Sequence, residues 1–225
     1  MTRPVLIELF YDVISPYSWI AFETLCRYKT RWNVTLSLKP FFLGGIMKET
    51  GNHAPAMVPN KASYMIADLS RLREFYKVPI YLPEDIFDVM FKKGSLSAQR
   101  FLTAVDMKNP EFTERLSRVL WTRVFQTHQD ITKLESFEQA GKEARLNDNV
   151  LQDSLARIAA QETKDRLTEF TKKALQYGAF GAPTIVAHLK EKPEVFFGCD
   201  RMELLAHIME ERWEGPQPDV STHKL

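Results

Sequence analysis

The sequence has only two cysteines, Cys26 and Cys199, and they lie far apart in the chain. A disulfide framework needs more thiols, and a CxxC redox pair or a zinc site needs them closely spaced. The 5 histidines show no HExxH or comparable ligand spacing, so no metal is expected. We therefore interpret both cysteines as reduced thiols of an intracellular protein.

The sequence also lacks an excess of charge of one sign. It has 30 Lys and Arg residues against 29 Asp and Glu residues, and no run of five or more basic residues. Nucleic acid and anionic membranes are therefore not expected as partners. No apolar run approaches the roughly 18 residues of a membrane-spanning helix, and no secretory leader pattern opens the chain. We expect a soluble globular protein without stable membrane insertion.

The N-terminal part predicts two strands joined by a helix. Residues 5–11 are apolar and rich in β-formers, which is typical of a buried strand. A helical pattern runs from residue 19 to about 32, and residues 34–42 then alternate with period two. This order implies parallel strands with a right-handed crossover. Residues 43–60 are rich in Gly, Pro, Asn and Met, so a loop is expected there.

The middle of the chain has helical periodicity only, and strands return after it. Helical segments are expected over residues 62–76, 83–91, 97–107, 110–125, 134–145 and 150–177. After the glycine-rich segment at 178–181, a hairpin is expected from 183–188 and 194–198, followed by a helix from 201 to 213.

The outline is βαβ, a helical block, then ββα, and it resembles the thioredoxin fold. We therefore predict an α/β, thioredoxin-like protein with a large all-helical insertion. Residues 1–60 and 179–225 would form the thioredoxin-like domain, and residues 61–178 the inserted helical domain. In this fold the reactive group follows the first strand, at the N-terminus of the first long helix.

Ser15 stands at that position. Serine is a good helix N-cap and Pro16 suits the first helical residue, so a structural cap is the simpler interpretation of this pair alone. A helix N-terminus also stabilises thiolates through its unpaired N–H groups and its dipole. The segment Ser15-Pro16-Tyr17-Ser18 has hydroxyls where a redox protein has thiols. It therefore suits a protein that binds the thiol of another molecule.

Gly181-Ala182-Pro183 provides a second feature of the predicted site. The segment leads into the third expected strand. Thioredoxin-like proteins have a cis-proline at this point, beside the helix whose N-terminus carries the reactive group. Cis X–Pro bonds are uncommon, at roughly 5–6%, so our expectation of one at Pro183 rests on the fold context. The backbone before such a proline can pair with an extended peptide. Glutathione is a peptide of this kind.

Several long segments resemble the kappa-class glutathione transferases, which are related to 2-hydroxychromene-2-carboxylate isomerases and bacterial disulfide oxidoreductases. These segments are residues 9–19, 45–52, 59–61, 93–105, 177–181 and 197–207. The resemblance runs from about residue 9 to residue 213. It implies a detoxifying transferase that uses glutathione as co-substrate, requires no metal, attacks a hydrophobic electrophile and forms a homodimer.

The resemblance also implies a glutathione site. Its residues would be Ser15, Pro16, Tyr17, Asn52, Lys61, Ala182, Pro183, Cys199, Asp200 and Arg201. Ser15 would be catalytic, because its hydroxyl would stabilise the glutathione thiolate. Lys61 would bind a carboxylate, and Ala182 would pair with the cysteinyl backbone through its main chain. Asp200 would hold the γ-glutamyl ammonium group.

Cys199 departs from the pattern, because the kappa class has serine there. A main-chain contact would survive this change, whereas a hydroxyl contact would weaken. A mixed disulfide with glutathione is one interpretation, and a small buried thiol is the simpler one. Glu8 and Asp12 are expected on the same side of the first strand, where they suit an acid–base role or a solvated edge. An isomerase and a non-catalytic glutathione-binding protein stay open as alternatives.

The chain ends Thr222-His223-Lys224-Leu225, which resembles the peroxisomal address Ser-Lys-Leu with its first residue changed. A peroxisomal address and a chance ending are both compatible with this tripeptide, so we expect a protein of peroxisomes or mitochondria. A mitochondrial location stays open, because a short or unusual import signal would escape this interpretation.

Overall fold

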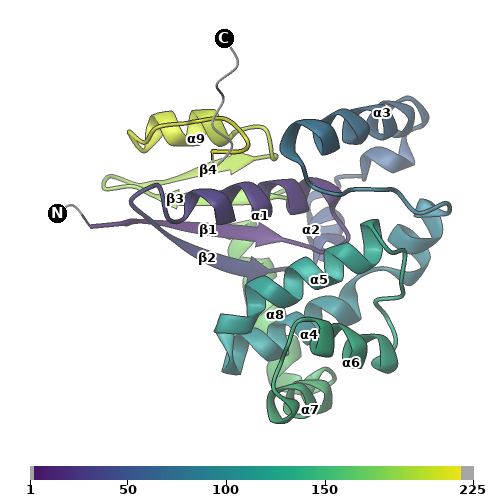
Figure 1. Ribbon diagram of the computed structural model, residues 1–225. Coiled ribbons are helices and arrows are strands. Elements are labelled where there is room, and N and C mark those ends of the chain that lie inside the picture. The colour runs from purple at the N-terminus through teal and green to yellow at the C-terminus, as the bar shows by residue number, and fades with distance from the viewer. Residues whose placement is uncertain (1–2, 219–225) are drawn as a thin grey trace.

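The computed structural model describes residues 3–218, and a four-stranded sheet of order β2-β1-β3-β4 lies at its centre (Figure 1). The strands are β1 (Val5–Tyr11), β2 (Val34–Pro40), β3 (Thr184–His188) and β4 (Pro193–Phe197). β1 is parallel to β2 and antiparallel to β3. The predicted α/β fold, with its βαβ and ββα halves around a helical block, is confirmed.

The two faces of β1 pack against different helices, as the period of two requires. Ile7, Leu9 and Tyr11 lie in one core cluster with residues of α1 (Pro16–Tyr28) and α5 (Thr113–Phe125). Phe10 lies in the other cluster, with Phe170 of α8 (Gln161–Gln176). Helices from both parts of the chain therefore bury the sheet.

The helical insertion begins with α3 (Pro59–Tyr76) and runs through α4 (Leu96–Lys108), α5, α6 (Leu134–Glu143), α7 (Asp148–Arg157) and α8. Figure 1 shows α4 to α8 gathered below the sheet and α3 beside α1. None of the helices among residues 3–218 combines the length and apolar character that crossing a bilayer requires. The two domain ranges expected from the sequence stay a prediction.

The expected loop over residues 43–60 is mostly helical, so that expectation was wrong. α2 spans Leu43–Thr50, a 3₁₀ turn covers Pro55–Met57, and α3 begins at Pro59. Gly44 allows the ring of Phe42 to pack closely against α2, because it has no side chain. A Cβ at that position would lie 2.7 Å from the ring of Phe42. The glycines that suggested a loop therefore permit close packing of a helix.

Three further boundaries differ from the predictions. The helix expected over 150–177 is divided into α7 and α8, although no Gly or Pro marks the break. The segment expected as a helix over 83–91 has π-helical geometry at Asp88–Lys93. The last helix, α9, spans only Met202–Ile208 rather than residues 201–213, and its Leu204 and Ile208 are 47% and 42% exposed.

Glu8 of β1 and Asp12, the residue after β1, are not at a solvated edge, because Glu8 is 2% exposed and Asp12 is fully buried. Lys173 Nζ lies 2.6 Å from Glu8 Oε1, and His188 Nε2 lies 2.9 Å from Glu8 Oε2. Lys173 belongs to α8 and His188 to β3. Glu8 therefore connects the sheet to the insertion through side-chain partners on the far side of the sheet from α1.

Candidate active site

Ser15 caps α1, and Pro16 is the first helical residue, as predicted. The backbone N–H of Ser18 donates to Ser15 Oγ at 3.1 Å, so one lone pair of the hydroxyl is engaged. The hydroxyl keeps its own hydrogen for donation to an incoming acceptor. Trp121 Nε1, from α5, donates to the carbonyl oxygen of Ser15 at 3.2 Å. The insertion therefore helps to fix the position of the predicted catalytic residue.

Asp12 holds the loop between β1 and α1. Its Oδ1 accepts from the backbone N–H of Ile14 at 3.1 Å. Its Oδ2 accepts from the backbone N–H of Leu43 at 2.9 Å and from Ser95 Oγ at 2.9 Å. Burial raises the pKa of Asp12 to about 6, although these three hydrogen bonds act in the opposite direction. One carboxyl group thus joins the Ser15 loop to the starts of α2 and α4.

Gln99 of α4 is a second buried polar residue behind the loop, and sequence reasoning missed it. Its Nε2 donates to the carbonyl oxygens of Tyr11, at 2.9 Å, and Phe41, at 2.7 Å. Its Oε1 accepts from the N–H of Val13 at 3.4 Å. These bonds fix the C-terminal ends of β1 and β2. The available signal was a glutamine among apolar residues on a helix, because a buried amide needs partners.

The predicted cis peptide bond is present between Ala182 and Pro183. Asn52 lies beside this segment, because its Nδ2 donates to the carbonyl oxygen of Phe180 at 2.7 Å. A Cβ at Gly181 would lie 2.9 Å from the ring of Phe197 and 3.6 Å from Asn52 Nδ2. The structure therefore brings Asn52 and the Ala182-Pro183 pair together.

The 199–201 segment reaches the same region at the end of β4. The N–H of Gly198 donates to the carbonyl oxygen of Pro183 at 3.1 Å, which holds the segment beside the cis-proline. Asp200 and Arg201 are exposed and form an ion pair of 2.6 Å. An acid and a base side by side on an exposed turn suit an amino acid end group, which carries both charges.

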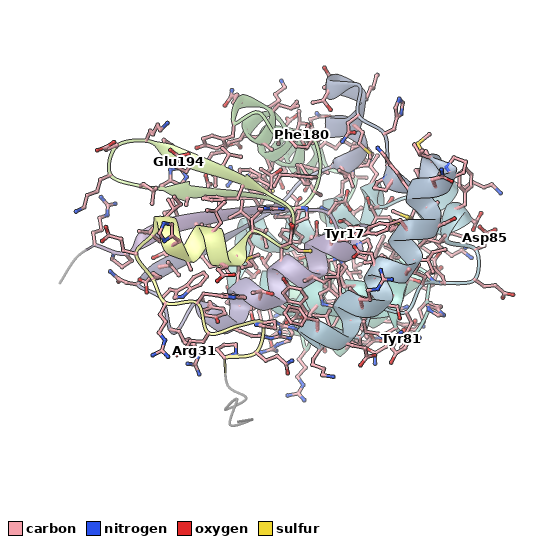
Figure 2. All side chains as sticks on the ribbon, turned by 90° about the horizontal axis from the view of Figure 1, so that it is seen from above. Tyr17, Arg31, Tyr81, Asp85, Phe180 and Glu194 are labelled. Atoms are coloured by element: carbon pink, nitrogen blue, oxygen red, sulfur yellow. The ribbon has the colours of Figure 1, made fainter. Side chains whose placement is uncertain are left out.

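Helix α3 contacts both Tyr17 and Cys199. The hydroxyl of Tyr17 donates to Asp68 Oδ2 at 3.2 Å, and Tyr17 lies between α1 and α3 in Figure 2. The hydroxyl of Tyr76 donates to the carbonyl oxygen of Cys199 at 3.5 Å. Burial raises the pKa of Tyr17 above its ordinary value, and the Asp68 carboxylate adds to that increase. Asp68 was not predicted from the sequence, and its carboxylate is the acceptor that orients the Tyr17 hydroxyl.

Cys199 is 4% exposed, and burial raises the pKa of its thiol to about 12. A thiol that stays protonated is a poor nucleophile, so this environment favours the simpler interpretation of a buried structural thiol. The thiol of Cys26 also stays protonated, because burial raises its pKa as well.

The side chain of Lys61 has no hydrogen-bond partner among residues 3–218. It is exposed on the first turn of α3 and forms no ion pair with the described residues. The same part of the chain contains no group of three or more His, Cys, Asp or Glu residues arranged to hold a metal. The roles assigned to the ten positions stay predictions.

Comparisons with known proteins place this geometry in a family. A model of the DSBA-like thioredoxin domain matches residues 6–210. Glutathione S-transferase kappa 1 from Homo sapiens is 47% identical over 222 residues, which cover 99% of this chain and 98% of that protein. A 2-hydroxychromene-2-carboxylate isomerase from Sphingobium xenophagum is 24% identical, over 88% of this chain and 95% of that protein.

A solved structure supports the fold independently. A 2-hydroxychromene-2-carboxylate isomerase superposes with a TM-score of 0.70 at 20% identity, covering 91% of this chain and 94% of that chain. The match over residues 6–210 and the identity of 47% over almost the full length confirm the resemblance found in the sequence. The chain belongs to the DSBA-like thioredoxin family and, within it, to the kappa class of glutathione S-transferases, a family of enzymes.

Proposed function

We propose that this enzyme binds glutathione, ionises its thiol at Ser15 and joins the sulfur to an electrophilic carbon of a hydrophobic small molecule, as a detoxification step. The observation that carries the proposal is the Ser15 hydroxyl at the N-terminus of α1. One of its lone pairs accepts from the N–H of Ser18, so its own hydrogen stays available for donation to an incoming anion.

The energies of the two stabilising interactions are sufficient for this role. Lowering the thiol pKa by two units corresponds to about 2.7 kcal/mol. A hydrogen bond to a charged group contributes about 1.5–3 kcal/mol, and a helix N-terminus contributes about 0.3–1 kcal/mol. The thiol proton goes to solvent. The thiolate then forms a carbon–sulfur bond, and the leaving group departs with its electron pair.

The surrounding residues suit the three parts of the peptide. The main chain of Ala182, before the cis-proline, pairs with the cysteinyl backbone by strand-like hydrogen bonds. The Asp200 and Arg201 pair faces the γ-glutamyl end, which carries an ammonium and a carboxylate. Lys61 has no partner among the described residues, so it is available to the glycyl carboxylate. Asn52 supports the loop that presents Ala182.

The test is a glutathione titration followed by thiolate ultraviolet absorbance. Ser15→Ala removes the hydroxyl, so we expect glutathione to bind without the thiolate signal at neutral pH. Ser18→Ala is the matched control, because Ser18 Oγ is buried without a hydrogen-bond partner among the described residues. It removes a hydroxyl from the same helical turn and leaves the capping N–H in place.

Three results would contradict the proposal. A thiolate signal that survives in Ser15→Ala would remove Ser15 from the mechanism. Binding without ionisation in the wild type would favour a non-catalytic glutathione-binding protein. Isomerisation of a chromene carboxylate without any conjugate would favour the isomerase, in which the thiolate adds reversibly and leaves again.

We also propose that the enzyme is a homodimer. Helix α3 exposes Tyr64, Ile66 and Phe75, which are 63%, 57% and 58% accessible in the single chain. Large apolar side chains gathered on one helix are a common mark of a contact surface. Analytical ultracentrifugation measures the mass directly. A monomer at micromolar concentration would contradict the proposal.

A location in peroxisomes, or alternatively in mitochondria, is proposed from the sequence. The C-terminal tripeptide His223-Lys224-Leu225 lies outside the described residues. Replacing these three residues and imaging the protein in cells tests the address. An unchanged location would contradict peroxisomal targeting by this ending.

A further inference from the structure

A cavity of about 410 Å³ lies between α2, α4 and α8, on the side of α2 that faces away from the Ser15 loop. Phe42, Gly45 and Glu49, at helical spacing, line it. The adjacent residues Leu43 and Ile46 pack instead into the core cluster that contains Ile14. One helix therefore separates this cavity from the proposed glutathione site. Its volume falls in the range of roughly 300–1,000 Å³ that is typical of small-molecule sites.

The wall of the cavity includes apolar side chains from the residue before α2, from α4 and from α8. Phe42 precedes α2, Leu96 begins α4, and Leu167 and Leu175 lie two turns apart on α8. Leu96 is 36% exposed, so apolar surface is accessible at this position. A ligand with an alkyl chain gains free energy by covering such a surface, at roughly 25 cal/mol per Å² of apolar area removed from water.

Three cations line the same cavity: Arg100, Lys164 and Lys172. Glu49 is the one acidic residue among the lining residues, which leaves a net charge of +2 from three positive and one negative side chain. None of the three cations forms an ion pair within residues 3–218. The Nε atom of Arg100 is buried and has no hydrogen-bond partner in the same part of the chain.

The other cations of α8 behave differently. Arg166 pairs with Glu169 at 2.7 Å, and Lys173 pairs with Glu8 at 2.6 Å. The unpaired cations of this helix are therefore those that line the cavity with Arg100. Like charges that line one cavity repel one another, and an anionic ligand in the cavity reduces that repulsion.

We propose that this cavity binds an amphiphilic monoanion, namely an acyl carboxylate of medium chain length. The carboxylate accepts from Arg100, with Lys164 and Lys172 nearby, and the alkyl chain lies on Phe42, Leu167 and Leu175. A small hydrophilic anion would leave the apolar wall in water. A neutral lipid would leave the cations without a partner. The chemistry of both halves of the cavity is satisfied only by a ligand with a charged head and an apolar tail.

Isothermal titration calorimetry of the full chain with octanoate tests the proposal, with acetate and 1-octanol as comparison ligands. We expect octanoate to bind at least about tenfold more tightly than either, because each comparison ligand lacks one half of the recognition. Arg100→Gln is expected to weaken octanoate binding about tenfold or more, in line with loss of a charge-assisted hydrogen bond. Lys108→Gln, at the exposed far end of α4, is the matched control and should leave the affinity unchanged.

Lys172→Gln keeps the test valid if Arg100→Gln does not fold, because Lys172 is exposed and its replacement leaves the core intact. We expect it to weaken octanoate binding about threefold. The proposal is overturned if octanoate does not bind at millimolar concentration. It is also overturned if octanol binds as tightly as octanoate, or if the cation variants bind octanoate as the wild type does. Thiolate formation by glutathione is measured in parallel, and it should be unchanged in these variants because α2 separates the two sites.

Discussion

Glu8 and Asp12 are two buried carboxyl groups on one face of the first strand, and their surroundings differ. Glu8 has two lysine neighbours, Lys173 at 2.6 Å and Lys39 at 4.0 Å, and a ring nitrogen of His188 at 2.9 Å. Burial raises the pKa of Glu8, but the bonds from Lys173 and His188 outweigh it, so the net pKa is lowered. Asp12 has three neutral donors and a pKa raised to about 6. Ionic partners, rather than burial alone, determine the charge of each group.

The difference between the pKa values of Glu8 and Asp12 corresponds to the positions of these two residues in the fold. Glu8 lies in the middle of the sheet, where a fixed charge joins β1, β3 and α8. Asp12 lies at the end of β1, where the chain turns into the Ser15 loop. At neutral pH Asp12 is held close to its own pKa, and a small change in its neighbours shifts its protonation. The part of the strand nearest the predicted catalytic residue is therefore the part with the less stable charge.

The largest expected effect is from Asp12→Ala. It removes the acceptor for two backbone N–H groups and the Ser95 hydroxyl, and leaves them unpaired in a buried place. With about 1–3 kcal/mol for each buried unsatisfied group, we expect a loss of about 4 kcal/mol in the free energy of unfolding. Urea denaturation at pH 7 measures it. A loss below about 1 kcal/mol would mean that water replaces the carboxylate and that the loop does not depend on Asp12.

The pH dependence is expected to be the next largest effect. The folded pKa of Asp12 is raised from 3.8 to about 6, so its contribution to stability is present below pH 3.8 and is lost as the pH rises through about 6. The difference between these two pKa values corresponds to about 3 kcal/mol. Glu8 has the opposite sign, because its pKa is lowered and its contribution is lost as the pH falls below 4.5.

Unfolding curves of the wild type and Asp12→Asn between pH 4 and 7 distinguish the contribution of the Asp12 carboxyl group from that of Glu8. The wild type should gain stability relative to the variant as the pH falls. A constant difference across this range would show that Asp12 does not titrate near pH 6.

Glu8→Gln should be less destabilising than Asp12→Ala, because Lys173 is partly exposed and can turn to water when its partner loses charge. We expect a loss of about 2 kcal/mol at pH 7, the size of a charge-assisted hydrogen bond. A double-mutant cycle with Lys173→Met isolates the pair. A coupling energy near zero would contradict a specific Glu8–Lys173 interaction.

Ser95→Ala is expected to have the smallest effect on stability, about 1 kcal/mol, because one neutral hydrogen bond is lost. It should also raise the pKa of Asp12 further, since one donor to the charged form is gone. NMR titration of the Asp12 carboxyl carbon measures this shift. Thr103→Ala, whose hydroxyl bonds only within α4, is the control and should leave the Asp12 pKa unchanged.

The features that were predicted correctly depend on local patterns or on the order of the elements along the chain. Ser15 and Pro16 are by themselves sufficient to predict the start of a helix. The cis bond at Pro183 was predicted from the order of the elements. The same-side placement of Glu8 and Asp12 followed from alternation. Their burial did not, because it depends on α8 and α4, which lie far along the chain and cover that face of the sheet.

The features that were missed are contacts between distant segments. Gln99 reaches Tyr11 and Trp121 reaches Ser15, over separations of 88 and 106 residues. No local sequence pattern predicts which backbone carbonyl will accept the hydrogen bond from a buried amide or indole. α2 was missed for a different reason, since its glycines pack closely against a ring and were interpreted as a loop signal.

The hydrogen bond from the Trp121 indole to the Ser15 carbonyl has an optical consequence. Trp121 is fully buried and lies nearly parallel to Trp19, with ring centroids 6.3 Å apart and an interplanar angle of 3°. A negative charge that arrives at Ser15 acts on this indole through a medium of low dielectric constant, where its field is strong. The emission spectrum of the protein should therefore shift when a thiolate forms. The difference between the emission spectra of the wild type and Trp121→Phe would follow thiolate formation in real time, without any added dye.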